Sequence, residues 1–533
     1  MSDSTIREEL AMQPIGLDKL EHAWLNLPTP TLYEHALQNK EGHLIHTGAL
    51  LVRNDHVSTQ AAQHKYIVDD PLIDHSGSHG EFQHSLSELQ FEALFNRIRA
   101  YLAGRALYVE DCLIAAQSEH EQPLRLITQD AWHALFAKTI FAQPNHNPAQ
   151  VDSQTDAQKP PFHIIHAPHF HADPSRDGTI GQSFVVMHFG LRIALIGGTA
   201  LAGEIKNTVF SMMIQRLAES DVLPLHAAVH VAEDGKPALL LGPEGSGKTT
   251  LVSDPDRPLL GDDAHGWSGK HIFNFEAGCY ASVDNLDQEN EPLIHNLCHR
   301  FGSILENVNL DIERRHAQFH QLNDNNHSRA AYPISGIADA AFPAILNSPK
   351  HLVLLACDAF GVLPAISRLS AEQVMYYFLL GYASQPNTDA SLEPVSTFSP
   401  CCGLPFMTQH PSMYAKILAA KIRQGSMQCW LLNTGWSGGP AGIGERMSIG
   451  LTRTLLKAAS NGQLNELEYQ THPVLGLQMP EQLDPMTTWH NQDDPNDYLS
   501  AAKSLAKKFN KAFAPFAEHM PAKVLKAGPR QTP

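Results

Sequence analysis

One stretch, Gly242–Thr250 with the sequence GPEGSGKTT, constrains this chain more than any other. It follows the apolar run 237–241 (PALLL) and precedes Leu251 and Val252, the order expected for a strand, a glycine-rich turn and a helix start. In that context the pattern G-x-x-x-x-G-K-[ST] points successive backbone N–H groups into one concavity that can hold phosphate oxygens. Lys248 would reach the outer phosphates, and the Thr249 hydroxyl would bind a magnesium ion. The predicted nucleotide-binding residues are Gly242, Pro243, Glu244, Gly245, Ser246, Gly247, Lys248, Thr249 and Thr250.

Three polar residues near this loop are candidates for metal binding. Asp262 and Asp263 end an apolar strand shortly after the loop, where a carboxylate can hold the metal of a nucleotide directly or through water. The alternative is a turn or helix-capping aspartate, but the nearby glycine loop favours the metal role. His226 lies in LPLHAAVHV, and a single histidine on such an apolar strand is more typical of a satisfied core residue than of a ligand.

Composition excludes several classes of function. The chain has 533 residues and a formal net charge of −18, so a nucleic-acid partner is not expected. Seven cysteines without a C-x-x-C pair predict neither a disulfide framework nor a zinc knuckle. The polar N-terminus and the lack of an apolar run near ~20 residues predict a soluble cytoplasmic protein without a membrane span. We expect a monomer or small homo-oligomer.

Hydrophobic patterning predicts an α/β protein. Leu17, Leu20, Trp24 and Leu25 have helical spacing, and Pro28 interrupts it. Helices are expected over 91–103, 131–141 and 204–218, and strands near 48–52, 65–68, 106–110, 162–166, 183–188 and 191–196. From about residue 222, short apolar strands alternate with glycine turns too closely for regular βαβ winding. The histidine-rich run FHIIHAPHFH (162–171) could bind a metal ion. The favoured interpretation is that these histidines are partly buried or surface residues without a metal.

Six blocks together resemble ATP-dependent phosphoenolpyruvate carboxykinases over nearly the whole chain. In chain order they are LIGGTALAGEIKNTVFSMM, LPLHAAVHV, GPEGSGKTTLVSDPDRPLLGDDAHGW, IFNFEAGCYA, DAFGVLPAISRLS and LLNTGWSGG. The resemblance implies a two-domain α/β fold, in which an N-terminal domain (1–221) covers the cleft of a P-loop mononucleotide-binding domain (222–533). It also implies the reaction of ATP with oxaloacetate to give phosphoenolpyruvate, CO2 and ADP, with Mg2+ on the nucleotide and a second divalent cation, Mn2+ or Mg2+.

The resemblance implies that this chain retains the residues that bind the nucleotide in the family. The loop 242–250 matches the phosphate loop, and Asp262 and Asp263 match the metal-binding aspartates. His226 matches a ligand of the second metal. The resemblance therefore favours metal binding by His226, whereas the residue considered alone is more typical of the core. Arg329 matches the arginine that contacts the transferred phosphoryl group. At the ribose and adenine the matching residues are Glu291, Arg446 and Thr452.

The half of the family site that binds the acid substrate is substituted. Gln60 stands where the family has a carboxylate-binding arginine, and Leu201 where it has a substrate-contacting tyrosine. Asn207 replaces a metal-binding lysine, although an amide oxygen still suits Mg2+ or Ca2+. Ser282 replaces the lysine that steadies the γ-phosphate. The family position of Glu244 usually holds a small residue, so this side chain adds negative charge near the phosphates.

Three functions follow from this pattern. The first is phosphoryl transfer from ATP, with a divalent metal, to a small acceptor other than oxaloacetate. The second is a working gluconeogenic carboxykinase whose site is rebuilt from residues such as Arg53, His56, His64 and Lys206. The third is an ATP-binding pseudoenzyme with a regulatory role.

Overall fold

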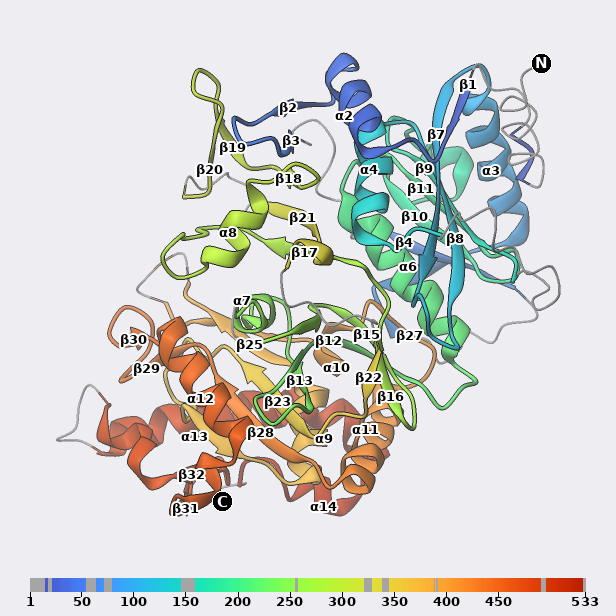
Figure 1. Ribbon diagram of the computed structural model, residues 1–533. Coiled ribbons are helices and arrows are strands. Elements are labelled where there is room, and N and C mark those ends of the chain that lie inside the picture. The colour runs from blue at the N-terminus through green and yellow to red at the C-terminus, as the bar shows by residue number, and fades with distance from the viewer. Residues whose placement is uncertain are drawn as a thin grey trace. The chain divides into compact units, whose positions relative to one another are not determined.

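A computed structural model of the protein divides into two compact units, which are described one at a time (Figure 1). Unit 1 comprises residues 1–218, 274–338 and 405–408, and unit 2 comprises residues 219–273, 339–404 and 409–533. The structure describes residues 15–17, 22–53, 64–70, 79–144, 159–254, 257–320, 328–337, 345–387, 389, 392–489 and 495–530. Segments 274–338 and 405–408 therefore pack with the N-terminal unit, which differs from the single boundary expected after residue 221.

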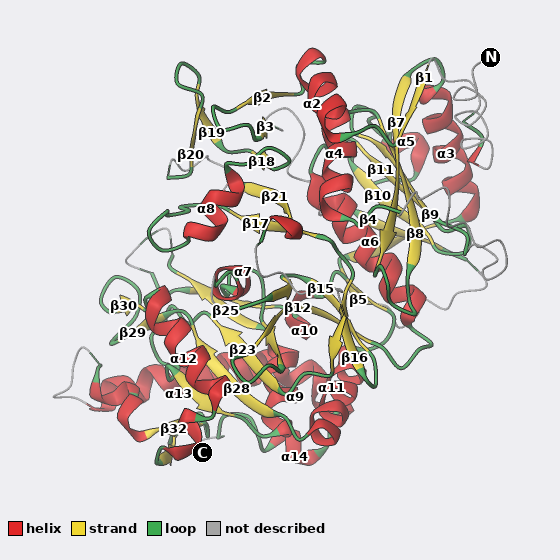
Figure 2. Ribbon diagram, viewed as in Figure 1, coloured by secondary structure: helices red, strands yellow, loops and turns green. Residues whose placement is uncertain are grey.

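Unit 1 is built on an eight-stranded mixed sheet (Figures 1 and 2). In spatial order its strands are β1 (His22–Leu25), β7 (Ala106–Ile114), β8 (Gln122–Thr128), β9 (Phe162–Ala167), β11 (Ile193–Gly197), β10 (Phe184–His188), β4 (Lys65–Val68) and β6 (Phe82–Leu86). Neighbouring strands β7 and β8, and β10 and β11, are antiparallel, and the other neighbours in the sheet are parallel.

Helices cover both faces of this sheet (Figure 1). Helix α3 (Glu88–Leu102) begins with a capping box at Ser87 and Gln90, and its apolar stripe joins the main core of the unit. Alternate strand residues such as Val109, Ile165 and Val186 face the same core. Helices α4 (Ala131–Ile140) and α6 (Ala202–Leu217) lie on the opposite face, where α6 contacts β9, β10 and β11. The predicted helices at 91–103, 131–141 and 204–218 are thus confirmed within a few residues.

The helix expected from Leu17 to Leu25 is wrong where the structure describes it. Residues 22–25 form strand β1, which pairs in parallel with β7, and Trp24 stacks on Tyr108 of that strand with ring centroids 4.8 Å apart. The first helix after it, α2 (Thr29–Gln38), has proline in its first turn. Cross-strand aromatic packing has therefore overridden the short helical spacing.

A second sheet completes unit 1. Its order is β17 (Gly278–Ser282), β21 (Arg329–Pro333), β18 (Ile304–Glu306), β3 (Leu50–Val52) and β2 (Gly42–Leu44). The remaining elements of the unit are α5 (Pro174–Asp177), α8 (Pro292–Cys298) and the strand pairs β19 (Asn309–Asp311) with β20 (His316–Gln318) and β5 (His79–Gly80) with β27 (Phe406–Met407). This sheet joins strands far apart in sequence, which explains why segment 274–338 belongs to the unit.

Unit 2 is organised around a large mixed sheet. Its order is β22 (Ile345–Asn347), β16 (His271–Asn274), β15 (Ala264–Trp267), β12 (Leu223–Val231), β13 (Pro237–Leu241), β23 (His351–Ala356), β28 (Gln428–Asn433), β24 (Ile366–Arg368), β32 (Gln478–Pro480) and β31 (Tyr469–Thr471), with β14 (Leu259–Gly261) beside β12. In the described part of this sheet, β13 and β28 each pair in parallel with β23, which lies between them, whereas β12 pairs antiparallel with β13, β14 and β15. The expectation that the strands are too close for regular βαβ winding is therefore confirmed.

The helices of unit 2 connect and flank these strands. They are α7 (Lys248–Val252), α9 (Ala371–Leu380), α10 (Pro400–Gly403), α11 (Pro411–Gly425), α12 (Ile449–Asn461), α13 (Pro495–Phe513) and α14 (Ala522–Leu525). Two small hairpins, β25 (Tyr382–Gln385) with β26 (Val395–Phe398) and β29 (Trp436–Ser437) with β30 (Glu445–Arg446), complete the unit. Among the residues that the structure describes, no helix has the length and apolar content to span a membrane.

A buried ion pair in unit 1 makes stability depend on pH. Glu110 of β7 is 1% exposed and lies 3.2 Å from the Lys138 ammonium of α4. Burial raises the pKa of Glu110 from 4.5 to about 7, although Lys138 opposes the shift. The pKa of Glu110 is higher in the folded protein than in the unfolded chain, so protonation of Glu110 stabilises the fold. This contribution to the free energy of unfolding is fully present below pH 4.5 and is lost as the pH rises through about 7.

We predict that Glu110→Gln flattens this part of the pH dependence. Between pH 5 and 7.5 the melting temperature of the wild type should fall relative to the variant by roughly 5 °C. Differential scanning fluorimetry at several pH values measures this, with exposed Glu92 of α3 as the matched control in Glu92→Gln. Parallel wild-type and Glu110→Gln curves would contradict the assignment.

Candidate functional site

The glycine loop of unit 2, residues 242–247, joins the end of β13 to the start of α7. Gly245 and Gly247 have φ angles of 76° and 89°, in the left-handed region that glycine adopts without steric cost. A side chain at Gly242 would lie 2.5 Å from the Ser246 hydroxyl, so the turn closes too tightly for a larger residue. The sequence therefore folds locally into the strand, turn and helix that its glycines predict.

Lys248 is held at the mouth of this turn. Its ammonium donates to the carbonyl oxygens of Gly242 (2.6 Å) and Pro243 (3.2 Å), and the residue is only 7% exposed. These two acceptors are neutral carbonyl oxygens, which fix the position of the ammonium. A contact from this ammonium to a phosphate group would be charge-assisted and therefore stronger than a contact to a carbonyl.

The residues after the loop continue the site. The Thr249 hydroxyl donates to Asp262 Oδ2 at 3.3 Å, which joins the start of α7 to the strand end at β14. Arg453 of α12 donates to the carbonyl oxygen of Thr250 at 2.9 Å, and the Thr434 hydroxyl donates to that of Ser246 at 3.0 Å. Sequence reasoning missed Arg453 and Thr434, because they come from segments about 200 residues away in sequence.

His226 of β12 pairs with Asp263, which lies directly before β15. His226 Nε2 lies 2.5 Å from Asp263 Oδ1, and His226 Nδ1 lies 2.8 Å from the carbonyl oxygen of Cys402. Because a carbonyl oxygen only accepts, Nδ1 carries a proton. A carboxylate also only accepts, so the contact to Asp263 is attractive only with a proton on Nε2, which a metal ion bound at that nitrogen would replace. A metal-binding histidine is oriented in this way in most proteins. Cys402 lies in a short left-handed turn with Cys401, at φ angles of 59° and 55°.

The predicted adenine residues also belong to unit 2. Arg446 lies on the β29–β30 hairpin, with its guanidinium 5.4 Å from the centroid of the Trp436 ring. Thr452 is buried in α12, where its hydroxyl donates to the carbonyl oxygen of Ser448. Arg453 links the same helix to α7, so α12 connects the predicted base site to the glycine loop.

In unit 1, two buried ion pairs fix the first half of α6. Lys206 lies 3.2 Å from Glu276, and each side chain is 3% exposed. Glu204 lies 2.7 Å from Lys65, which also contacts Glu81. Burial alone would lower the pKa of Lys65, but the two carboxylates more than offset it and the pKa is raised. Lys206 is therefore committed to a carboxylate within unit 1.

Arg329 and Ser282 face each other across β17 and β21 of unit 1. The guanidinium of Arg329 lies 5.8 Å from the centroid of the Tyr280 ring, and the Tyr280 hydroxyl donates to Glu306. Burial, and then the charge of Glu306, raises the pKa of Tyr280 well above its usual value. Exposed Ser282 donates to Asp284 at 3.1 Å. At the position where the sequence resemblance predicts a lysine in the family, this chain thus has a hydroxyl beside a carboxylate.

The other predicted residues of unit 1 occupy separate places. Leu201 is the N-cap residue of α6, Asn207 lies in its second turn and Glu291 is the N-cap residue of α8. Arg53 donates to Asn309, and His64 precedes β4. Gln60 and His56 lie outside the described residues.

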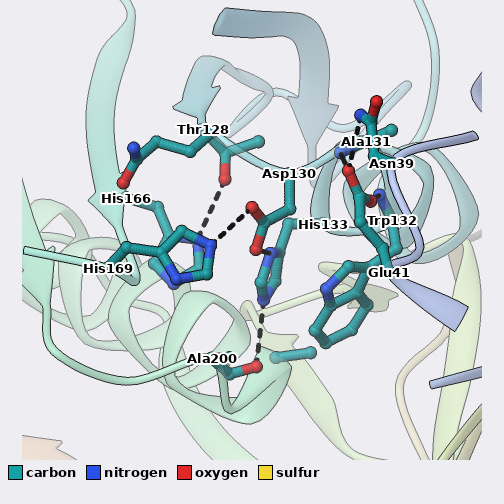
Figure 3. A network of polar contacts seen from close by, with 12 residues as sticks. Asn39, Glu41, Thr128, Asp130, Ala131, Trp132, His133, His166, His169 and Ala200 are labelled. Atoms are coloured by element: carbon teal, nitrogen blue, oxygen red, sulfur yellow. Dashed lines mark hydrogen bonds and ion pairs between the residues drawn. The ribbon is translucent and has the colours of Figure 1, made fainter. Parts of the chain in front are cut away.

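The unit 2 residues fit a nucleotide-bound hard cation better than a cation held by protein alone. In the described ranges, no group of three or more His, Cys, Asp or Glu side chains is arranged to hold a metal ion. Thr249, Asp262, Asp263 and His226 supply oxygen and nitrogen donors, and Mg2+ commonly takes one or two carboxylates together with phosphates and water. His166 and His169 of the histidine-rich run bond to Thr128 and Asp130 (Figure 3), so the structural interpretation of that run is favoured.

The sequence comparisons agree with this arrangement. The family model described as phosphoenolpyruvate carboxykinase matches residues 21–488. A protein of Pelobacter propionicus named phosphoenolpyruvate carboxykinase (ATP) is 40% identical over 538 residues, covering 99% of this chain and 100% of the relative. One of Thermus thermophilus with the same name is 39% identical, covering 97% and 99%.

The chain therefore belongs to the ATP-dependent phosphoenolpyruvate carboxykinase family. This confirms the resemblance and the α/β fold class. Family membership implies the use of ATP and of a divalent metal ion.

Lys248→Ala should weaken binding of MgATP by about 10- to 100-fold, the cost of one charge-assisted contact to phosphate. Isothermal titration calorimetry measures this. Lys457→Ala is the matched control, since Lys457 lies in the same unit and pairs with Glu233 at 2.5 Å. If Lys248→Ala and the wild type bind MgATP with equal affinity, the assignment of the glycine loop to the nucleotide site is wrong.

Proposed function

We propose that this protein transfers the γ-phosphoryl group of ATP, with Mg2+ and a second divalent cation, to a small acceptor other than oxaloacetate. The observation that carries the proposal is the contrast between the two units. In unit 2, Lys248, Thr249 and Asp262 are linked around the glycine loop, and His226 is oriented toward Asp263. In unit 1, Ser282 beside Asp284 offers no cation to a phosphate or a carboxylate.

The protein side chains would act by holding charge in place. Lys248 would bind the outer phosphates, and Arg329 would contact the phosphoryl group in transit. Thr249, Asp262, Asp263 and His226 would hold a metal ion, which when bound neutralises charge that develops on the phosphate oxygens. The bond between the γ-phosphorus and the β–γ bridging oxygen breaks, ADP leaves, and the acceptor oxygen forms the new bond to phosphorus.

Magnitudes favour a changed acceptor. A hydrogen bond to a charged group is worth roughly 1.5–3 kcal/mol, and the glutamine at position 60 replaces a two-pronged charged donor. Removing a group that stabilises transition-state charge commonly costs about 10²–10³ in rate. With Gln60, Leu201 and Ser282 in place of the arginine, tyrosine and lysine of the family, we expect little turnover of oxaloacetate.

A second candidate is phosphoenolpyruvate carboxykinase activity itself. It is favoured by the full-length identity of about 40% to relatives that carry this name, and by the retention of Lys206 and Arg329. The reaction of ATP with oxaloacetate to give phosphoenolpyruvate, CO2 and ADP would then use a rebuilt acid site. The two candidates differ in whether phosphoenolpyruvate and CO2 are formed from oxaloacetate.

With ATP, Mn2+ and saturating oxaloacetate, we expect no phosphoenolpyruvate from the wild type above a reaction without protein. The triple variant Gln60→Arg, Leu201→Tyr, Ser282→Lys should form phosphoenolpyruvate at about 100-fold or more above that background, since it restores charge and a polar contact. Coupled detection of phosphoenolpyruvate and ADP measures both. Equimolar phosphoenolpyruvate and ADP from the wild type would establish the second candidate instead.

A further inference from the structure

Basic side chains gather at one edge of the large sheet of unit 1. Strands β8, β9 and β11 are parallel neighbours, so their first residues lie along the same edge. Helix α6 follows β11 after a short turn and packs on β9, β10 and β11, which brings its last turn back to that edge (Figure 1). The basic residues placed there are His120 before β8, Lys159 before β9, Arg192 before β11 and Arg216 in the last turn of α6.

The guanidinium of Arg192 has donors that no described residue satisfies. Its Nε and Nη2 atoms are buried, and neither has a hydrogen-bond partner in the part of the chain that the structure describes. The guanidinium lies over the Phe162 ring, 4.4 Å from the ring centroid, so an aromatic face holds it. A buried donor without a partner is costly and needs a physical explanation, of which a bound ion is one.

The backbone at position 192 does not favour an arginine. Arg192 closes the turn between β10 and β11, where its N–H donates to the carbonyl oxygen of Phe189 at 3.1 Å. Its φ angle of 60° lies in the left-handed region, which glycine adopts without steric cost and a residue with a side chain does not. Strained residues of this kind are concentrated at ligand sites. The turn thus gives no local reason for the arginine, and its side chain is the feature to explain.

The groups around Arg192 add positive charge. Burial, and then the charge of Arg216, lowers the pKa of Arg192. Burial also lowers the pKa of His120, and the charges of Arg216 and Lys159 add to that shift although Glu119 opposes it. The cations at this edge are therefore close enough to repel one another, in a chain whose formal net charge is −18.

Carboxylates at this edge do not neutralise the two arginines. Among the described residues, neither Arg192 nor Arg216 forms an ion pair, and Glu219, which follows α6, does not pair with Arg216. Two other carboxylates have partners of their own, namely Asp111 with Arg125 at 2.6 Å and Glu119 with His120 at 3.5 Å. Arg192 and Arg216 thus carry positive charge that no protein group offsets within the described ranges.

This edge is separate from the sites described above. Leu201 is the N-cap residue of α6, and Arg216 lies about 22 Å further along the helix at about 1.5 Å per residue. The glycine loop belongs to unit 2, whereas both arginines belong to unit 1. An anion held by Arg192 and Arg216 would therefore occupy neither the substituted acid site nor the glycine loop.

We propose that Arg192 and Arg216 bind a phosphate group, either as inorganic phosphate or as part of a small phosphate monoester. Each guanidinium offers a planar fork of N–H donors, and a phosphate dianion has enough oxygens to accept from both forks at once. A single carboxylate carries one negative charge and matches one fork. Lys159 adds a third positive charge that attracts an anion to this edge. The phosphate oxygens would supply the acceptors that the Arg192 donors lack.

NMR spectra of the full chain labelled with nitrogen-15 at arginine test the proposal at the level of single side chains. The Lys248→Ala background removes a competing phosphate contact at the glycine loop, and Arg192→Gln assigns the Arg192 Nε–H resonance. We expect this resonance to shift and saturate as inorganic phosphate is added. Glycerol 3-phosphate, titrated separately, distinguishes the two sources: a response to both probes shows a site for phosphate groups in general, and a response to inorganic phosphate alone shows a site for the free ion.

Isothermal titration calorimetry in the same background gives the affinities. Arg192→Gln and Arg216→Gln should each weaken phosphate binding by about 10-fold or more, the loss of one charge-assisted contact. Arg192→Lys keeps the charge and loses the fork, so its affinity should lie between those of Arg192→Gln and the parent protein. Arg105→Gln is the matched control, because Arg105 also stacks on an aromatic ring, that of Tyr101, but its Nε donates to a carbonyl oxygen at 2.8 Å.

Three results would overturn the proposal. They are an Arg192 Nε–H resonance that phosphate does not shift, an equal affinity of Arg192→Gln and the parent protein for phosphate, and the same response to chloride at equal ionic strength. Arg216 is exposed at the end of α6, so Arg216→Gln tests the site even if Arg192→Gln fails to fold. The measurements follow phosphate binding in unit 1 alone and are independent of the proposed phosphoryl transfer.

Discussion

The nucleotide half of this protein depends on the left-handed backbone at Gly245 and Gly247. These two residues turn the chain back on itself between β13 and α7, and so bring the Lys248 ammonium onto the carbonyl oxygens of Gly242 and Pro243. A side chain at either glycine would be strained in this conformation. Thr249, Asp262 and the α12 contact through Arg453 all take their positions from this turn.

Unit 1 fixes its most important helix by a different means. The first half of α6 is held by buried charges, Lys206 on Glu276 and Lys65 on Glu204, rather than by a side-chain cap. Buried charges are stable only when paired, and removing one partner commonly costs 3–5 kcal/mol, roughly, because the other is left uncompensated. The position of α6 is therefore tied to the ionisation of its neighbours. Neither Leu201 nor Ser282 is a member of those pairs.

Local signals predicted much of this structure. The glycine loop and helices α3, α4 and α6 depend on spacing within one segment, so the sequence alone identified them. Strand β1 was not predicted, because the packing of Trp24 on Tyr108 decides its conformation. The carbonyl of Cys402 that orients His226 is 176 residues away in sequence, and no local pattern connects them.

The central claim is that ATP donates its γ-phosphoryl group to a small acceptor other than oxaloacetate. Its most direct test is a screen of small carboxylic acids, each incubated separately with the protein, Mg2+ and ATP labelled with 32P at the γ-phosphorus. We expect the label in a new organic phosphate with one non-oxaloacetate acid, in amounts equal to the ADP formed and absent with Lys248→Ala. Label transferred only with oxaloacetate, or no transfer to any acid while MgATP binds, would contradict the account.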